Sequence, residues 1–176
     1  LRRWHLTQAV AGEAHGRALA SAGGRVRVHL ALDTGMHRLG IPAEDHKAIA
    51  RLYRLRNLDI RGVFSHLCVS DSLVPADMAY TQGQLALFYN TLEWMRGQGL
   101  DPGKVHIQAS YGIWDLPPQP CAYARAGIAL YGVQSTSGPV LRALDLRPVL
   151  SLRARVASVR TLSPGEGAGY GLAFHA

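Results

Sequence analysis

Hydrophobic and polar positions along the first three quarters of the chain follow two alternating periods. Apolar residues three and four positions apart, with glycine stops, predict helices at 8–22, at about 43–56 and from Pro75 to about Gly97. Short runs of β-branched and long apolar residues predict strands at 25–32, 60–65, 104–108 and 122–125. Helices and strands that take turns in this way are typical of a parallel α/β architecture.

The pattern changes after that region. From Val149 to Val156 apolar and polar residues alternate strictly, which predicts a half-solvated strand of an antiparallel sheet. We therefore place a domain boundary between Ser135 and Leu146. The expected units are an α/β unit at 1–135 and the beginning of a β-domain at 146–176.

Composition narrows the class of protein. The chain has 176 residues, 48% of them hydrophobic, which predicts a globular domain rather than a disordered one. The formal charge of +7 comes mostly from scattered arginines, so we interpret it as an arginine preference and expect no nucleic-acid partner. Two cysteines without a CxxC motif predict a reduced, cytoplasmic protein, and the eight histidines match no metal motif. The absence of an initial methionine suggests a piece of a longer protein.

Polar side chains follow the predicted strands, where a β/α barrel carries its active site. They are Arg38, His66, Ser110 and Arg125. Gly127 and Ile128 come directly after Arg125, and a glycine there allows backbone N–H groups to approach an anion. Together with the Ser110 hydroxyl they predict a phosphate cradle. Each residue taken alone also fits a structural role, so spacing leaves the ligand unnamed.

Six segments resemble the alanine racemase family, whose members depend on pyridoxal phosphate. They are 28–40 (VHLALDTGMHRLG), 62–67, 106–110, 125–132, 146–156 and 169–171. The forms of 108–112 and 121–125 resemble the serine/alanine racemases of vancomycin-resistance systems more than housekeeping enzymes. The resemblance implies the second half of a (β/α)8 TIM-type barrel followed by the start of a C-terminal β-domain.

The resemblance also implies an activity and partners. The parent would be a homodimeric isomerase with shared active sites that racemises a small amino acid, alanine or serine, and supplies D-amino acids for the cell wall. Whether the parent is membrane-anchored stays open.

Residue roles follow from the same resemblance. Arg125 would bond the pyridine nitrogen of pyridoxal phosphate, and His66 would lie near the ring and bond Arg125. Arg38 would lie beside the phenolic oxygen, and Tyr170 would move the substrate α-proton in the partner subunit's site. The phosphate would be held by Ser110, Gly127 and Ile128. Because arginine stays protonated, it cannot give the ring nitrogen a proton, which weakens the electron sink and limits side reactions.

Several positions depart from the family pattern. The lysine that binds the cofactor covalently would lie upstream, and neither Lys47 on a predicted helix nor Lys104 at a strand start can replace it. Ala31 stands where many members have a modified lysine, and Ala109 stands where asparagine is common. We therefore expect this chain alone to be inactive.

Two other readings stay open. One is a non-catalytic barrel that binds pyridoxal phosphate, and the other is a truncated fragment that acts as an interaction module. Cys68, two residues after His66, is better explained as a small buried side chain than as a nucleophile. Four strands cannot close an eight-stranded barrel, so an oligomer or another chain must cover the open sheet.

Overall fold

A parallel sheet forms the centre of the molecule. The computed structural model describes residues 1–135, 138–142 and 144–176. The sheet has the order β1-β2-β4-β5, with every neighbouring pair parallel, and a short β3 also pairs with β2. The strands are β1 (Gln8–Val10), β2 (Val26–Asp33), β3 (Ile41–Pro42), β4 (Leu58–Phe64) and β5 (Lys104–His106). The parallel α/β architecture expected from the hydrophobic pattern is confirmed.

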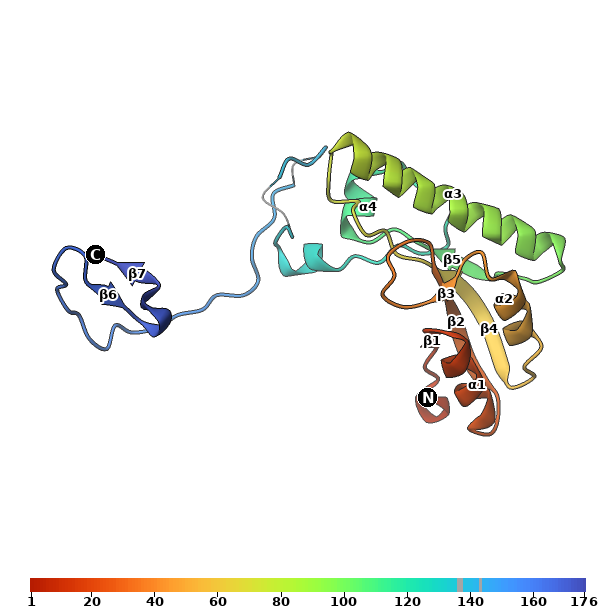
Figure 1. Ribbon diagram of the computed structural model, residues 1–176. Coiled ribbons are helices and arrows are strands. Elements are labelled where there is room, and N and C mark those ends of the chain that lie inside the picture. Colours follow the sequence, from red (N-terminus) through yellow and green to blue (C-terminus); the bar gives the residue numbers. More distant parts are fainter. Residues whose placement is uncertain (136–137, 143) are drawn as a thin grey trace.

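Helices cover one face of this sheet (Figure 1). They are α1 (Glu13–Ser21), α2 (His46–Tyr53) and α3 (Pro75–Gly97), with a short α4 (Ser110–Asp115) after β5 and 3-10 turns η1 (Arg2–Trp4), η2 (Ile128–Tyr131) and η3 (Tyr170–Leu172). Among the described residues no helix combines the length and hydropathy that a membrane crossing requires.

Side-chain parity along the strands separates the two faces of the sheet. In β2, Val26, Val28 and Leu30 are buried in the apolar core under the helices, whereas Arg27 is exposed and His29 is half-buried on the opposite face. Because successive side chains of a strand point to opposite faces, one face of the sheet packs apolar residues and the other presents polar ones. The candidate functional residues lie on the polar face and at the C-terminal ends of its strands.

The first predicted helix begins too early. Gln8–Val10 forms β1 and pairs with β2, and the helix starts only at Glu13, after Gly12. A strand of three residues is too short to establish an alternating pattern, and the alanines around it favour a helical interpretation. The second predicted helix is real but shorter, and its first turn is capped by the Asp45 carboxylate, which accepts a hydrogen bond from Ala48 N at 2.9 Å.

The predicted strand at 122–125 is wrong. Only one parallel bridge forms there, between Ala109 and Arg125, with a hydrogen bond of 2.9 Å from Arg125 N to Gln108 O. In the part of the chain that the structure describes, no strand pairs with the outer side of this segment, so a continuous ladder does not develop.

The predicted strand at 149–156 is also wrong. The segment lies extended without a partner strand among the described residues, and Leu152 is 97% exposed. An isolated strand cannot pair its backbone groups or bury its apolar face, so alternation alone does not produce a sheet. The segment leads away from the α/β unit to a small hairpin of β6 (Gly167–Ala168) and β7 (Phe174–His175) (Figure 1). Residues 136, 137 and 143 of the expected linker lie outside the described residues.

Gly62 in β4 allows two neighbouring strands to approach closely. A Cβ atom at this position would contact Lys104 O and would lie 2.7 Å from the ring of His29. We expect Gly62→Ala to lower the free energy of unfolding by about 1–3 kcal/mol because the crowding involves backbone. Urea denaturation measures this change, and Gly83→Ala on α3, where a Cβ atom meets nothing, is the control. An equal effect of both substitutions would contradict the prediction.

Candidate functional site

The segments that follow β5 bring a hydroxyl and backbone amides together. Ser110 is the first residue of α4, and its Oγ accepts hydrogen bonds from Gly127 N at 2.9 Å and from Ala129 N at 3.2 Å. Both bonds use the oxygen as acceptor, so the hydroxyl proton remains able to donate. The bridge between Ala109 and Arg125 holds the two segments side by side. Ser110, Gly127 and Arg125 therefore meet at one edge of the sheet.

The space beside these amides fits an anion. A Cβ atom at Gly127 would meet only Ser110 Oγ, at 3.8 Å, so the Cα side of this residue is open. Gly127 N and Ala129 N donate to Ser110 Oγ, whereas Ile128 N, between them, does not, and Ile128 is 37% exposed. Hydroxyl and backbone N–H donors bind phosphate, so the Ser110 hydroxyl proton and Ile128 N–H fit the phosphate of the cofactor.

The Arg125 guanidinium is fixed by several partners. Its Nη2 donates to Ser65 O at 2.8 Å and to Ile107 O at 3.2 Å, and the group lies 5.5 Å from the centre of the Phe64 ring. Two imidazoles complete the set, with His106 Nδ1 2.5 Å from Nη1 and His66 Nδ1 3.2 Å from Nη2. Because the guanidinium only donates, both Nδ1 atoms must accept, and both rings are neutral with their proton on Nε2.

Electrostatics favour the same neutral state. Burial, followed by the charges of Arg125 and Arg38, lowers the pKa of His66. Burial, followed by the charge of Arg125 and the neighbouring His29, lowers the pKa of His106 to about 4. His106 Nε2 lies 2.9 Å from His29 Nδ1, so the contacts of Arg125 continue through two rings into the polar face of the sheet.

Sequence reasoning did not identify His106 and His29 as part of this network. Both positions were predicted to lie in strands, but no role was assigned to either. The alternation of side chains along a strand could have identified them, because residues two positions apart point to the same face. His29 shares its face with Arg27, and His106 shares its face with Lys104, opposite the apolar core.

The neutral His106 makes folding sensitive to acid. Its pKa is about 4 in the folded protein against a model-compound value of 6.5, so the unfolded chain binds a proton first as the pH falls. We expect this residue to reduce the free energy of unfolding by about 1–2 kcal/mol between pH 6.5 and pH 4, with no further change below. Urea denaturation over that range measures the slope. His106→Asn should flatten it, and an unchanged slope would contradict the assignment.

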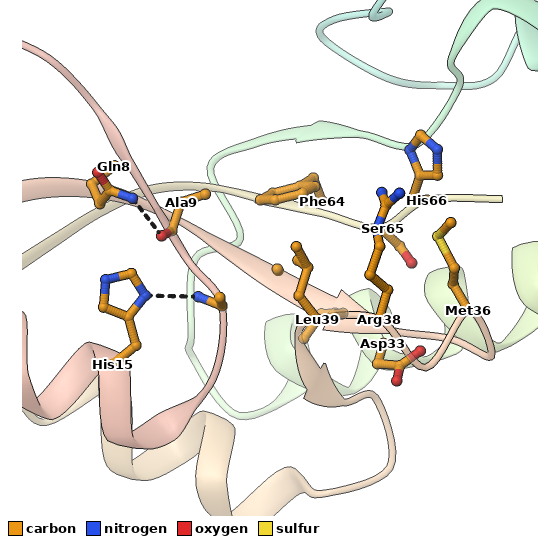
Figure 2. Close-up of a pocket in the computed structure, with 13 residues that line it drawn as sticks. Gln8, Ala9, His15, Asp33, Met36, Arg38, Leu39, Phe64, Ser65 and His66 are labelled. Atoms are coloured by element: carbon orange, nitrogen blue, oxygen red, sulfur yellow. Dashed lines mark hydrogen bonds between the residues drawn. The ribbon is translucent and has the colours of Figure 1, made fainter. Parts of the chain in front are cut away.

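A pocket of about 280 Å³ is lined in part by Ser65 and His66, two of the residues that Arg125 contacts. Arg38 extends from the loop after β2, with its guanidinium directed toward Ser65 and His66 (Figure 2). The loop is held by Asp33, whose carboxylate accepts hydrogen bonds from Gly35 N at 2.9 Å and His37 N at 3.0 Å. Ala31 also lines the pocket, and Arg38 forms no ion pair within the described residues. The pocket therefore presents the Arg38 guanidinium, which has no ion-pair partner among the described residues, close to Ser65 and His66.

Other predicted site residues lie elsewhere. Tyr170 is fully exposed in η3, between β6 and β7, and is not among the hydrogen-bond partners of Arg125. Lys47 is exposed on α2, and Lys104 is exposed at the first residue of β5, with Nζ 5.2 Å from the centre of the Tyr123 ring. The described residues thus place no lysine at the site, and they hold no cluster of three or more histidine, cysteine or acidic side chains that could bind a metal ion.

Known proteins match this chain over most of its length. The family described as alanine racemase, N-terminal domain, matches residues 1–135. An amino-acid racemase of Enterococcus faecalis is 37% identical over 100% of this chain and 25% of its own length. A serine/alanine racemase of Enterococcus gallinarum is 40% identical over 97% of this chain and 24% of its own length. The chain thus spans about a quarter of these relatives.

Solved structures agree with the sequence match. The biosynthetic alanine racemase from Pseudomonas aeruginosa superposes with a TM-score of 0.76 at 30% identity, over 99% of this chain and 47% of that one. An alanine racemase of Clostridium difficile superposes with a TM-score of 0.74 at 25% identity. The match over 1–135 includes His66, Ser110 and Arg125. This chain belongs to the alanine racemase family.

Proposed function

We propose that the protein containing this chain is a pyridoxal-phosphate-dependent racemase of a small amino acid, alanine or serine. The observation that carries the proposal is the single network in which Arg125 lies beside the Ser110 and Gly127 cradle at the ends of β4 and β5. The amino-acid racemase and serine/alanine racemase names of the relatives support the substrate class.

Each residue then has a chemical task. When bound, pyridoxal phosphate supplies an electron sink for charge that develops on the substrate α-carbon. Arg125 would face the ring nitrogen and, being permanently protonated, would leave that nitrogen without a transferred proton. His66 would orient Arg125, and Arg38 would provide positive charge near the phenolic oxygen. Ser110, Gly127 and Ile128 would hold the phosphate.

Racemisation needs proton carriers on both faces of the substrate. We assign one of them to Tyr170, acting in the partner subunit of a homodimer, because its side chain is fully exposed in the chain alone. The other would be a lysine of the parent outside this chain, since Lys47 and Lys104 lie away from the site. The 176 residues by themselves are then inactive.

The proposed architecture follows the same division. Residues 1–135 form the C-terminal half of the cofactor-binding barrel, and 146–176 begin the β-domain. Cys68 and Cys121 are free thiols, which supports a reducing, cytoplasmic location for this part of the protein.

The test uses the full-length protein and the 176-residue chain side by side. The full-length protein should bind pyridoxal phosphate, yield a pyridoxyl-lysine after borohydride reduction and interconvert the enantiomers of alanine or serine. The chain alone should do none of these until the upstream half is added in trans. Cofactor binding without interconversion would favour a non-catalytic barrel, and no cofactor binding by the full-length protein would overturn the proposal.

A further inference from the structure

Gln84 is a buried side chain with a polar amide on α3, a helix whose other buried side chains are apolar residues and two threonines. It is only 2% exposed and lies beside Leu85 and Phe88 in the interior. A side-chain amide moved from water into such surroundings is destabilising unless hydrogen bonds replace those it made with water. The identity of its partners therefore shows what the amide does.

The amide of Gln84 uses its full hydrogen-bonding capacity. Oε1 accepts from Cys68 N at 3.1 Å and from Cys68 Sγ at 3.4 Å. Nε2 donates to His66 O at 3.2 Å and to Thr34 Oγ1 at 3.4 Å. Two acceptor sites and two N–H donors are all that a carboxamide has. One side chain thus joins the loop after β2 to the loop after β4.

These partners are the backbone that holds Arg125. The loop after β4 supplies Ser65 O, which accepts from Arg125 Nη2 at 2.8 Å, and His66 Nδ1, which lies 3.2 Å from the same nitrogen. Thr34 Oγ1 lies 2.7 Å from Ser65 Oγ, so the Gln84 contact with Thr34 reaches Ser65 as well. Gln84 and Arg125 therefore bond the same loop, Gln84 at His66 O and Cys68 N and Arg125 at Ser65 O and His66 Nδ1.

We propose that Gln84 is a positioning residue, which sets the backbone of residues 65–68 and through it the contacts of Arg125 with Ser65 and His66. Its meaning for racemisation rests on the proposed function, but the local claim about the loop does not. A side chain that merely filled space would tolerate an apolar residue of similar size. A side chain that positions the loop needs both its acceptor and its donors.

Two substitutions separate these roles. Gln84→Met keeps the approximate shape and removes every hydrogen bond. Gln84→Glu keeps the acceptor for Cys68 N and removes the N–H donors to His66 O and Thr34. Thr91→Val is the matched control, because Thr91 is also 2% exposed on α3, and its hydroxyl bonds only Leu87 O and Ala43 O, away from the site.

The first measurement is hydrogen exchange of the full-length protein without cofactor, followed in the peptide that contains Cys68. Gln84→Met should speed exchange of the Cys68 amide by about tenfold or more, which corresponds to about 1.4 kcal/mol. Thr91→Val should leave that peptide unchanged even if it lowers the melting temperature. Gln84→Glu should retain more protection than Gln84→Met.

The second measurement is the dissociation constant of pyridoxal phosphate, followed by its absorbance, together with kcat and KM. Both Gln84 variants should weaken cofactor binding by about tenfold, or about 1.4 kcal/mol, and Thr91→Val should not. Unchanged exchange at Cys68 and unchanged cofactor affinity in folded Gln84→Met would overturn the proposal. If the unsubstituted protein binds no cofactor, the proposed function fails, and the exchange result still decides the role of Gln84.

Discussion

Tyr170→Phe in the full-length protein is expected to lower kcat by about 10²–10⁴-fold, the range that a positioned acid–base group contributes. The phenol is fully exposed in this chain, so loss of its hydroxyl should affect the stability of the chain's own fold little. The loss should therefore appear in racemisation and not in the melting temperature or in cofactor affinity. The defect is expected in removal of the α-proton from one enantiomer only, because the proposed role of Tyr170 concerns one face of the substrate.

Exchange of the substrate α-proton with deuterated solvent measures that asymmetry. One enantiomer should lose its α-proton far more slowly than the other in Tyr170→Phe. Tyr131→Phe is the control, since Tyr131 is also exposed, at 64%, and has no assigned role in proton transfer. Equal activity of both variants, or an equal slowing from both enantiomers, would remove Tyr170 from the mechanism.

Arg125→Lys is expected to reduce kcat by about 10²–10³-fold, the usual effect of removing one preorganised donor. A lysine keeps the positive charge but cannot span Ser65 O, Ile107 O and the two imidazoles as the planar guanidinium does. Two buried carbonyls would then lose their donor, so the melting temperature should also fall.

The absorbance of bound cofactor separates the two effects of this substitution. If Arg125 acts at the ring, the spectrum of bound pyridoxal phosphate should change as well as the rate. Arg54→Lys, at the exposed end of α2, should change neither. A full rate in Arg125→Lys with a normal spectrum would contradict the assignment of Arg125 to the ring nitrogen.

The sequence predicted the convergence of Ser110, Gly127 and Arg125 better than it predicted the elements around them. Parallel strands present their C-terminal ends at one edge, so polar residues placed after successive strands must converge, as Ser110 and Arg125 do. That argument needs only the order and direction of strands, which hydrophobic runs record well. It does not need every element to be assigned correctly, since the structure replaces a predicted helix with a strand at 8–10 and shows no strand at 122–125.

The remaining site residues depend on tertiary contacts. His106 becomes a partner of Arg125 because two strands lie side by side, and Gln84 reaches His66 from a helix 18 residues further along the chain. A glutamine within a helical pattern is ordinarily read as solvent-facing. The prediction of a strand at 149–156 was wrong because it also depends on tertiary contacts. Alternating apolar residues show that the segment could present an apolar face, but not that a partner strand is there to pair with it.

The all-parallel order β1-β2-β4-β5 restricts what can extend this sheet. A β-hairpin reverses direction within a few residues, so docking one beside β1 would set an antiparallel strand next to a parallel array. A further parallel strand can be added only through a crossover connection, usually a helix, that packs on the helical layer and returns the chain to the start of the next strand. Engineering a minimal complement for this half should therefore begin with a strand–helix–strand module, and peptides of a single turn should fail.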